Sequence, residues 1–451
     1  MKYDLATISQ KLSDAQLNEL AHQTNFSATP DSPINGSRFV HSFFAALQTN
    51  LSYVSLSDWA HQLMLNYGVD VSRQALDNRT SYGRQVDFAR GVLQQAMACQ
   101  LNSQLQHRSP GKLTDVAACF GRILLNDSSC VKLPPQLHEL FPGAHSRHGN
   151  LTATARIQLT YDLLTHQYVE LDLLGYRQND QSYAYEIVSQ LRPADLVLRD
   201  QGYFVLGAFE QIAEKGAYFL SRLRPGTHVY RPDDDSPIDL LALAEQQQRK
   251  GITQFEIRAE VGKEQRLPVR ILFAEMSQQQ YQARRRKAIK DRSAKANHNQ
   301  TYLRLLNWTI LITNAEPEQL SVQQALKLYG FRWQIEIMFK TWKSSFNLQA
   351  IFLSPQGMKD NRMLITMYLA LAFFVLSCTR TFQYVAQQVY GLHQRYLSLI
   401  KWTRFLAQGG VKALEEWSDD EFIEYAARAL VHDRRKDRQS AAEAIYSFFY
   451  N

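Results

Sequence analysis

The sequence predicts an α/β protein whose central region is flanked by helical segments at both ends. Short apolar runs rich in Val, Ile and Leu recur between residues 120 and 314, as expected for strands. Before and after that region the apolar residues recur at helical spacing. The length of 451 residues exceeds what one hydrophobic core usually supports, so about two or three domains are expected.

The composition is that of a folded, soluble protein, with 45% hydrophobic and 21% charged residues. A net charge of +7 is mild for this length and favours nucleic acid over acidic small molecules as the partner. The four cysteines form no Cys-x-x-Cys pair, which argues against a zinc site or a disulfide framework and suits a reducing cytoplasm. No apolar run follows the N-terminal Met-Lys-Tyr-Asp-Leu, so a secretory signal is not expected.

Residues 1–110 are expected to form a helical domain. The stretch 35–51 has apolar residues at helical spacing, and a second helix starts near Ser55. After a break that contains a glycine, another helix carries Arg73 and Arg79. This order fits a DNA-binding helix-turn-helix, and it fits equally well a small helical bundle with surface arginines.

The central region, 111–385, contains a series of expected strands. They cover residues 121–127, 153–162, 167–174, 195–200, 217–223, 253–259, 266–273 and 308–314. Asp127 and Asp200 each stand where an apolar strand is expected to end. Because α/β sheets build their sites at such strand ends, the two aspartates are candidate site residues, although each could be a simple turn residue.

Two further segments of the chain have unusual composition. The run 279–295 is strongly basic, from Arg284 to Lys295, and is either a phosphate-contacting segment or a solvated helix face. Met363 to Thr379 is almost entirely apolar, and a buried core helix is favoured over a membrane span because the chain is otherwise soluble in character. Residues 386–451 are expected to form a helical C-terminal region.

The stretch from Tyr329 to Lys343 predicts a helix with two distinct faces. At about 100° per residue, one face carries a carboxylate among cations and a phenol, and the adjoining face is apolar. The residues of the first face are Tyr329, Arg332, Glu336, Lys340 and Lys343. Such a face suits a metal ion and a polyanion, but an exposed Glu–Lys pair on a solvated helix gives the same pattern.

Three carboxylates, Asp127, Asp200 and Glu336, would suffice to hold magnesium, which takes oxygen ligands and keeps water and phosphate oxygens in its other positions. Two such ions can promote in-line displacement at a phosphodiester. Glycoside hydrolysis by a carboxylate pair is a competing chemistry, but it does not account for the basic residues around Glu336. No P-loop, Gly-x-Gly-x-x-Gly or Gly-x-Ser-x-Gly motif is present.

The spacing Tyr329-x2-Arg332-x3-Glu336-x6-Lys343 resembles the Tyr-Arg-Glu-Lys signature of DDE transposases of bacterial insertion sequences of the IS-four type. Asp127, in Leu-Leu-Asn-Asp-Ser-Ser, is similar to the family's first aspartate, and Asp200, in Leu-Val-Leu-Arg-Asp-Gln-Gly, to its second. Here Ser-Ser follows the first aspartate, where many members have Gly-Thr or Ser-Thr.

The resemblance implies a ribonuclease-H-like catalytic core with a β-rich insertion at about 224–305. It implies that Asp127, Asp200 and Glu336 are the catalytic residues and the ligands of two Mg²⁺ ions, with Mn²⁺ as an alternative. The DNA contacts that it implies are Tyr329, Arg332, Lys340, Lys343, Trp308 and Arg222. For Trp308, stacking on a flipped base and simple packing in the core both stay open.

The function that the resemblance implies is cut-and-paste transposition in the bacterial cytoplasm, in association with the nucleoid. The partners would be double-stranded DNA, both terminal inverted repeats and target, and a second copy of the chain in a paired-end complex, with no membrane. The alternatives are a nuclease of the same core without strand transfer and a DNA-binding derivative without catalysis.

Overall fold

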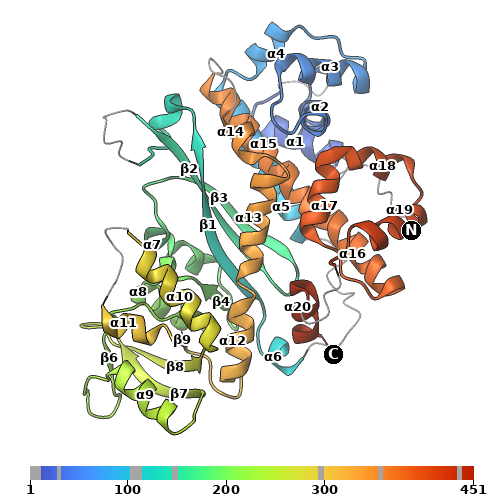
Figure 1. Cartoon of the computed structure of the whole chain (residues 1–451). Helices are drawn as coiled ribbons and strands as arrows, with labels where there is room; N and C mark the ends of the chain where they lie inside the picture. Colours follow the sequence, from blue (N-terminus) through green and yellow to red (C-terminus); the bar gives the residue numbers. More distant parts are fainter. Residues whose placement is uncertain are drawn as a thin grey trace. The chain divides into compact units, whose positions relative to one another are not determined.

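The computed structural model describes residues 12–27, 32–101, 114–144, 151–292, 299–353, 359–433 and 439–450 (Figure 1). The predicted boundary between residues 110 and 111 lies outside these ranges, as does Lys295 of the basic run. The chain divides into two compact units. Unit 1 comprises Met1–Lys112, Ser128–Gln178 and Gln334–Asn451, and unit 2 comprises Leu113–Asp127 and Asn179–Trp333.

A nine-stranded mixed sheet, in the order β3-β2-β1-β4-β5-β9-β8-β7-β6, confirms the predicted α/β class with flanking helical regions. The strands are β1 (Ile123–Leu133), β2 (Ala153–Asp162), β3 (Gln167–Gly175), β4 (Leu196–Arg199), β5 (Tyr218–Arg222), β6 (Val229–Tyr230), β7 (Gln254–Val261), β8 (Leu267–Glu275) and β9 (Trp308–Thr313). β1, β4 and β5 pair in parallel, whereas β5–β9, β9–β8, β8–β7 and β7–β6 pair antiparallel. The β-rich insertion therefore continues the sheet through β9.

Unit 2 has apolar strands and a set of short helices. The central strand β4 is buried along its whole length, as expected for a strand with a parallel neighbour on each side. The helices of this unit are α6 (Asp115–Ala118), α7 (Asp180–Tyr183), α8 (Leu206–Glu214), α9 (Leu240–Arg249), α10 (Gln278–Lys290), α11 (Gln300–Leu305) and α12 (Val322–Gly330). Asn314 joins β9 to β5, because its amide donates to the Ala217 carbonyl at 3.0 Å and accepts from the Phe219 N–H at 2.9 Å.

Unit 1 is built around two long helices, α5 (Gly83–Leu101) and α15 (Asp360–Cys378), which pack against each other. The stretch Asp360–His393 is long and apolar enough to cross a membrane by length and composition, but 89% of its most apolar window is buried. That burial supports the prediction of a core helix. The later helices are α16 (Arg380–His393), α17 (Leu399–Phe405), α18 (Val411–Glu416), α19 (Asp419–Ala429) and α20 (Ala441–Phe449).

The N-terminal helices of unit 1 form a bundle with an aromatic core. They are α1 (Asp14–Gln23), α2 (Gly36–Thr49), α3 (Leu56–Tyr67) and α4 (Arg73–Arg79). The break before α4 lies at Gly68, whose φ of 64° is readily adopted by glycine. Arg79 donates to the Ile34 carbonyl at 2.9 Å and lies over the Phe26 ring, while Asp77 pairs with Lys359 at 2.9 Å. Arg79 therefore packs within the bundle, whereas Arg73 is exposed, and the helix-turn-helix interpretation stays a prediction.

Two local predictions were wrong, both beside candidate site residues. β1 does not end at Asp127 but continues to Leu133, because β2 flanks β1 within the sheet and provides a backbone partner beyond the pairing with β4. The predicted single helix from Tyr329 to Lys343 is two helices: α12 ends at Gly330, and α13 (Trp333–Ser344) begins after a turn at residues 331 and 332. Backbone bonds Phe331 N to Leu328 O and Arg332 N to Tyr329 O tighten that turn.

Candidate active site

The parallel register of β1 and β4 aligns the two candidate aspartates. Asn126 is paired with Arg199, and the next residue on each chain segment is an aspartate, Asp127 and Asp200. Neighbouring strands lie about 4.8 Å apart, so this register brings the two aspartates side by side at one edge of the parallel pairing. Asp200 keeps extended backbone angles and leads into the short turn Gln201–Tyr203.

Arg332 and Tyr329 approach these aspartates from α12 and the turn that follows it. Arg332 Nη1 donates to Asp127 Oδ2 at 3.3 Å, and the two side chains are only 11% and 18% exposed. Burial, with a smaller contribution from the nearby negative charge of Asp200, raises the pKa of Tyr329 to about 12, while Arg332 and Arg222 oppose that shift. The phenol is therefore protonated at neutral pH and able to donate to an oxygen ligand.

Arg222, at the end of β5, belongs to the same cluster, because the parallel pairing of Arg199 with Ser221 places Arg222 beside Asp200. Its charge also acts on Tyr329 and Arg284. Trp308, by contrast, is buried at 3% exposure. Its ring makes edge contacts with Phe255 and Phe273, at centroid distances of 5.6 and 6.3 Å. The Trp308 ring is thus packed in the core of the chain without DNA, and its stacking on a flipped base stays a prediction.

The remaining candidates, Glu336, Lys340 and Lys343, lie on α13 in unit 1. The predicted apolar face of this helix is buried there: Trp342 lies against Tyr168 at a centroid distance of 5.7 Å and against Phe374 at 6.1 Å. Lys340 is exposed and Glu336 half-buried. The ammonium of Lys343 donates to the Cys130 carbonyl at 3.1 Å, so it also holds the second half of β1.

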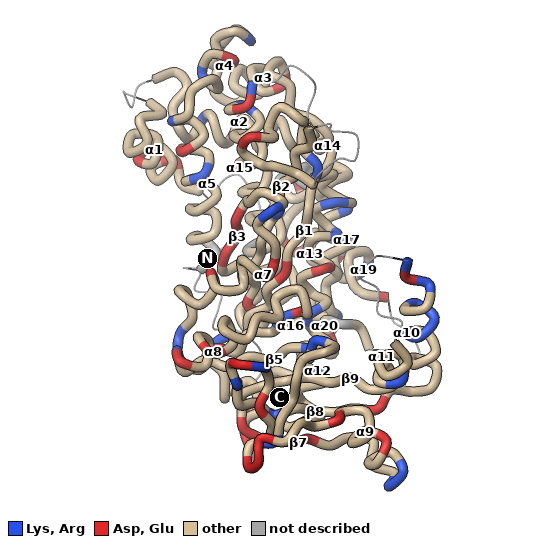
Figure 2. The backbone as a smooth tube through the Cα atoms, turned by 90° about the vertical axis from the view of Figure 1, so that its left-hand side faces the viewer, with Lys and Arg blue, Asp and Glu red and all other residues tan. Residues whose placement is uncertain are grey.

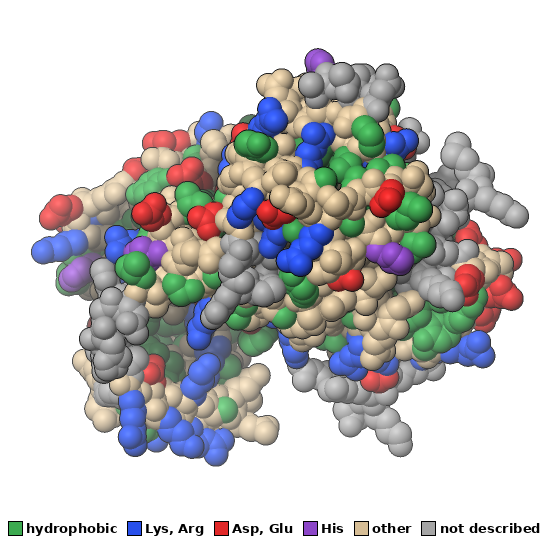
Figure 3. Space-filling model, turned by 90° about the horizontal axis from the view of Figure 1, so that it is seen from above, with side chains coloured by type: hydrophobic (Ala, Val, Ile, Leu, Met, Phe, Trp, Pro, Cys, Tyr) green, Lys and Arg blue, Asp and Glu red, His purple; other side chains and the backbone are tan. Residues whose placement is uncertain are grey.

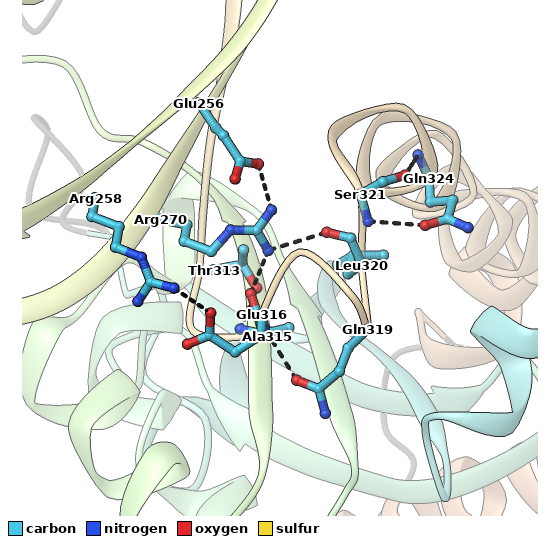
Figure 4. A network of polar contacts seen from close by, with 10 residues as sticks. All are labelled: Glu256, Arg258, Arg270, Thr313, Ala315, Glu316, Gln319, Leu320, Ser321 and Gln324. Carbon is cyan, nitrogen blue, oxygen red and sulfur yellow. Dashed lines mark hydrogen bonds and ion pairs between the residues drawn. The ribbon is translucent and has the colours of Figure 1, made fainter.

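A polar network fixes the loop that connects β9 to α12 (Figure 4). The guanidinium of Arg270, on β8, is only 4% exposed and donates to the carbonyls of Ala315 and Leu320 in this loop. It also pairs with Glu256 at 2.5 Å, and β7 thereby contributes to the same network. The inserted hairpin thus supports the start of the helix that carries Tyr329.

Asp127 and Asp200 offer the oxygen donors that magnesium takes in proteins, and Arg332 and Tyr329 add the means to hold a phosphate oxygen beside them. Among the described residues, no group of three or more His, Cys, Asp or Glu side chains is assembled for a metal ion. Glu336 follows Arg332 by four positions in the chain, but it belongs to the other unit.

The surface charge is spread over several groups of side chains. Figure 3 shows Lys and Arg on the face that it draws, with Asp, Glu and hydrophobic side chains between them. Along the backbone, basic residues are dense on α10, where Arg286, Lys287 and Lys290 are exposed (Figure 2). The surface of α10 is therefore more positively charged than the modest net charge of the whole chain suggests.

Comparison with known proteins identifies the family. Residues 118–371, which include both aspartates, the turn at Arg332 and α13, match the model described as "Transposase DDE domain". The chain belongs to this DDE transposase family. The match confirms the expectation of a DDE transposase of an insertion sequence.

Similar proteins include transposases of insertion sequences from Bacillus and Clostridium. The transposase for insertion sequence element IS231F of Bacillus thuringiensis subsp. israelensis is 31% identical over 247 residues, which cover 51% of this chain and 51% of that protein. The IS231D transposase of B. thuringiensis subsp. finitimus is 32% identical over 280 residues, covering 58% and 56%. The IS1151 transposase of Clostridium perfringens is 24% identical over 401 residues, covering 85% and 81%. The chain thus spans about half the length of the IS231 relatives that it matches.

Among solved structures, the piggyBac transposase synaptic complex with hairpin DNA matches 98% of this chain and 88% of that chain. The sequence identity is 10% and the TM-score 0.42. The similarity is distant.

Sequence reasoning overlooked two arginines of this DDE transposase domain. Arg270 stood in an ordinary strand pattern and gave no signal. Arg284 lay in the basic run, but its neighbours Arg222 and Tyr329 come from distant parts of the chain. Only the fold separates Arg284 from the other cations of its helix.

Proposed function

We propose that this chain is a transposase that cuts the DNA at the ends of its insertion sequence and joins those ends to a target. The alignment of Asp127 with Asp200 on adjacent parallel strands is the observation that carries the proposal. The contact of Arg332 with Asp127 supports it, because a cation at that position can hold a phosphate oxygen close to the carboxylates.

Asp127, Asp200 and Glu336 would hold divalent magnesium, with manganese as an alternative. Bound there, the metal would activate the attacking oxygen and stabilise the leaving oxygen. Arg332 and the protonated phenol of Tyr329 would bind the non-bridging oxygens of the phosphodiester, and Lys340 and Lys343 would contact the backbone nearby. In a paired-end complex, two copies of the chain would each hold one end.

The test is cleavage of a duplex that carries the terminal inverted repeat flanking this chain's own gene. Cleavage should require Mg²⁺ or Mn²⁺ and should be lost on addition of EDTA. Asp127→Asn, Asp200→Asn and Glu336→Gln should each reduce the cleavage rate by about a thousandfold or more, because each removes a charged ligand. Binding of the duplex should persist in all three variants.

Asp239→Asn is the matched control. Asp239 is an exposed carboxylate of unit 2 that caps α9, and asparagine caps a helix equally well. This variant should cleave at the wild-type rate. Cleavage that survives the three site substitutions would refute the assignment of the carboxylates. Cut ends that never join a target plasmid would indicate a nuclease, and binding without any nicking an inactive derivative.

A further inference from the structure

Arg284 differs from the other cations of the basic helix α10. Arg286, Lys287 and Lys290 are exposed and Arg285 is half-buried, whereas Arg284 is half-buried and also contacts β9 through its guanidinium. Its Nη2 donates to the hydroxyl of Thr309 at 3.4 Å, a long hydrogen bond. Its Nη1 is buried and makes no hydrogen bond. A guanidinium has five N–H donors, and among the described residues Arg284 makes one hydrogen bond, the long one to Thr309.

The charged surroundings of Arg284 do not neutralise it. Arg222 on β5 is paired with Leu311 on β9, two positions along that strand from Thr309, so Arg222 and the hydroxyl that Arg284 contacts lie on the same face of the sheet. The groups whose charges act on Arg284 are this second cation and the phenols of Tyr302 and Tyr329. Burial and the charge of Arg222 lower the pKa of Arg284 to about 10, which still leaves it charged at neutral pH. Within the described ranges, neither arginine forms an ion pair with a carboxylate. A half-buried cation without a counter-ion is unfavourable, and an anion would relieve it.

The position of this arginine pair relates it to the candidate active site. The parallel register of β4 and β5 pairs Arg199 with Ser221, so the residues that follow them, Asp200 and Arg222, lie side by side. Tyr329 interacts electrostatically with both of them. All these residues belong to unit 2, so their arrangement is internal to one compact body. Two adjacent guanidinium groups beside a phenol match the chemistry of a phosphate, which accepts paired N–H donors.

We propose that Arg284, together with Arg222 and the phenol of Tyr329, forms a subsite for a DNA backbone phosphate beside Asp200. The inserted helix α10 thereby contributes directly to substrate binding. This inference rests on the proposed function, since the phosphate belongs to the DNA that the proposed transposase would bind. It assigns the basic segment two roles: an inward arginine that binds one phosphate, and outward cations that add a diffuse positive charge.

The first test is DNA binding as a function of salt concentration, with the inverted-repeat duplex and Ca²⁺ in place of Mg²⁺. Arg284→Gln should weaken binding about tenfold and reduce the slope of log K against log salt by about one, the share of a single phosphate contact. The control is Arg249→Gln, which removes one exposed charge from α9 of the same unit. The control should change both quantities less. An Arg284→Gln affinity and slope equal to those of the wild type would overturn the proposal.

The second test locates the phosphate. Single neutral methylphosphonate linkages are placed in turn around the cleavage site. At one position the neutral linkage should weaken binding of the wild type but not that of Arg284→Gln. The substitution and the neutral linkage each remove the same interaction, between Arg284 and that phosphate, so the second change costs nothing more. Additive losses at every position would overturn the subsite.

Thermal unfolding separates a binding role from a structural one. Without DNA, Arg284→Gln should unfold at or above the wild-type temperature, since the substitution removes the repulsion between Arg284 and Arg222. A clear fall would show that Arg284 is structural. If the wild type binds no inverted-repeat duplex, the proposed function fails. The subsite is then tested alone with inorganic phosphate. Exchanging chloride for phosphate should raise the unfolding temperature of the wild type more than it raises that of Arg284→Gln. Equal rises in the two proteins would overturn the subsite.

Discussion

Replacing Arg270 with methionine tests whether the inserted hairpin holds α12 in place. Methionine keeps much of the buried volume but removes every donor of the guanidinium. The carbonyls of Ala315 and Leu320 lose their partner, and Glu256 loses its cation. We expect the loop before α12 to open more often, and α12 with it.

The magnitude follows from burial. Each buried carbonyl left without a donor costs about 1–3 kcal/mol. Breaking a buried ion pair costs about 3–5 kcal/mol, but the Glu256 side chain is 32% exposed, so water recovers part of that loss. With the lower end of the range for each carbonyl and about 1 kcal/mol for the ion pair, we expect at least about 3 kcal/mol in total, which corresponds to a rise of about a hundredfold or more in the opening constant.

Hydrogen exchange of the amides of Val322–Gly330 measures this opening locally, so that cooperative unfolding of the whole chain is not required. Arg258→Met is the matched control, since Arg258 belongs to the same network but pairs with Glu316 at the surface. These two side chains are 69% and 49% exposed, and such a pair contributes about 0–1 kcal/mol. Exchange in Arg270→Met no faster than in Arg258→Met would refute the proposed support of α12.

Two further substitutions address single contacts of the site. Arg332→Gln removes the cation beside Asp127 and should lower the cleavage rate about tenfold to a hundredfold, with partial recovery in Arg332→Lys; an unchanged rate would show that the contact has no catalytic consequence. Trp308→Ala should destabilise the fold by about 3–5 kcal/mol in urea unfolding, because it empties a buried aromatic site. Trp308→Phe should bind the inverted-repeat duplex as the wild type does, whereas a tenfold loss would indicate base stacking.

Most of the secondary structure follows from local patterns. The helix predicted at 35–51 is observed as α2, Gly36–Thr49, with Asn35 at its N-cap. The hairpin predicted at 153–162 and 167–174 is observed as β2 and β3. Such elements are predictable because apolar periodicity and turn residues act over a few neighbouring positions.

Contacts with other parts of the chain decide where some strands and helices end. The polar residues after Asp127 suggested the end of a strand, but β1 has β2 as its other neighbour in the sheet and continues to Leu133. An unbroken amphipathic pattern suggested one helix from Tyr329 to Lys343, but Gly330 and a tight turn divide it. Local pattern cannot show which backbone groups find partners elsewhere in the chain.

The sequence by itself determined the α/β class, the two aspartates and the spacing of Tyr329, Arg332, Glu336 and Lys343, because these depend on residue type and local order. The tertiary structure alone decided the alignment of Asp127 with Asp200, the pairing of Arg332 with Asp127 and the inward position of Arg284. Sheet register and burial depend on contacts between distant segments, which no local pattern specifies.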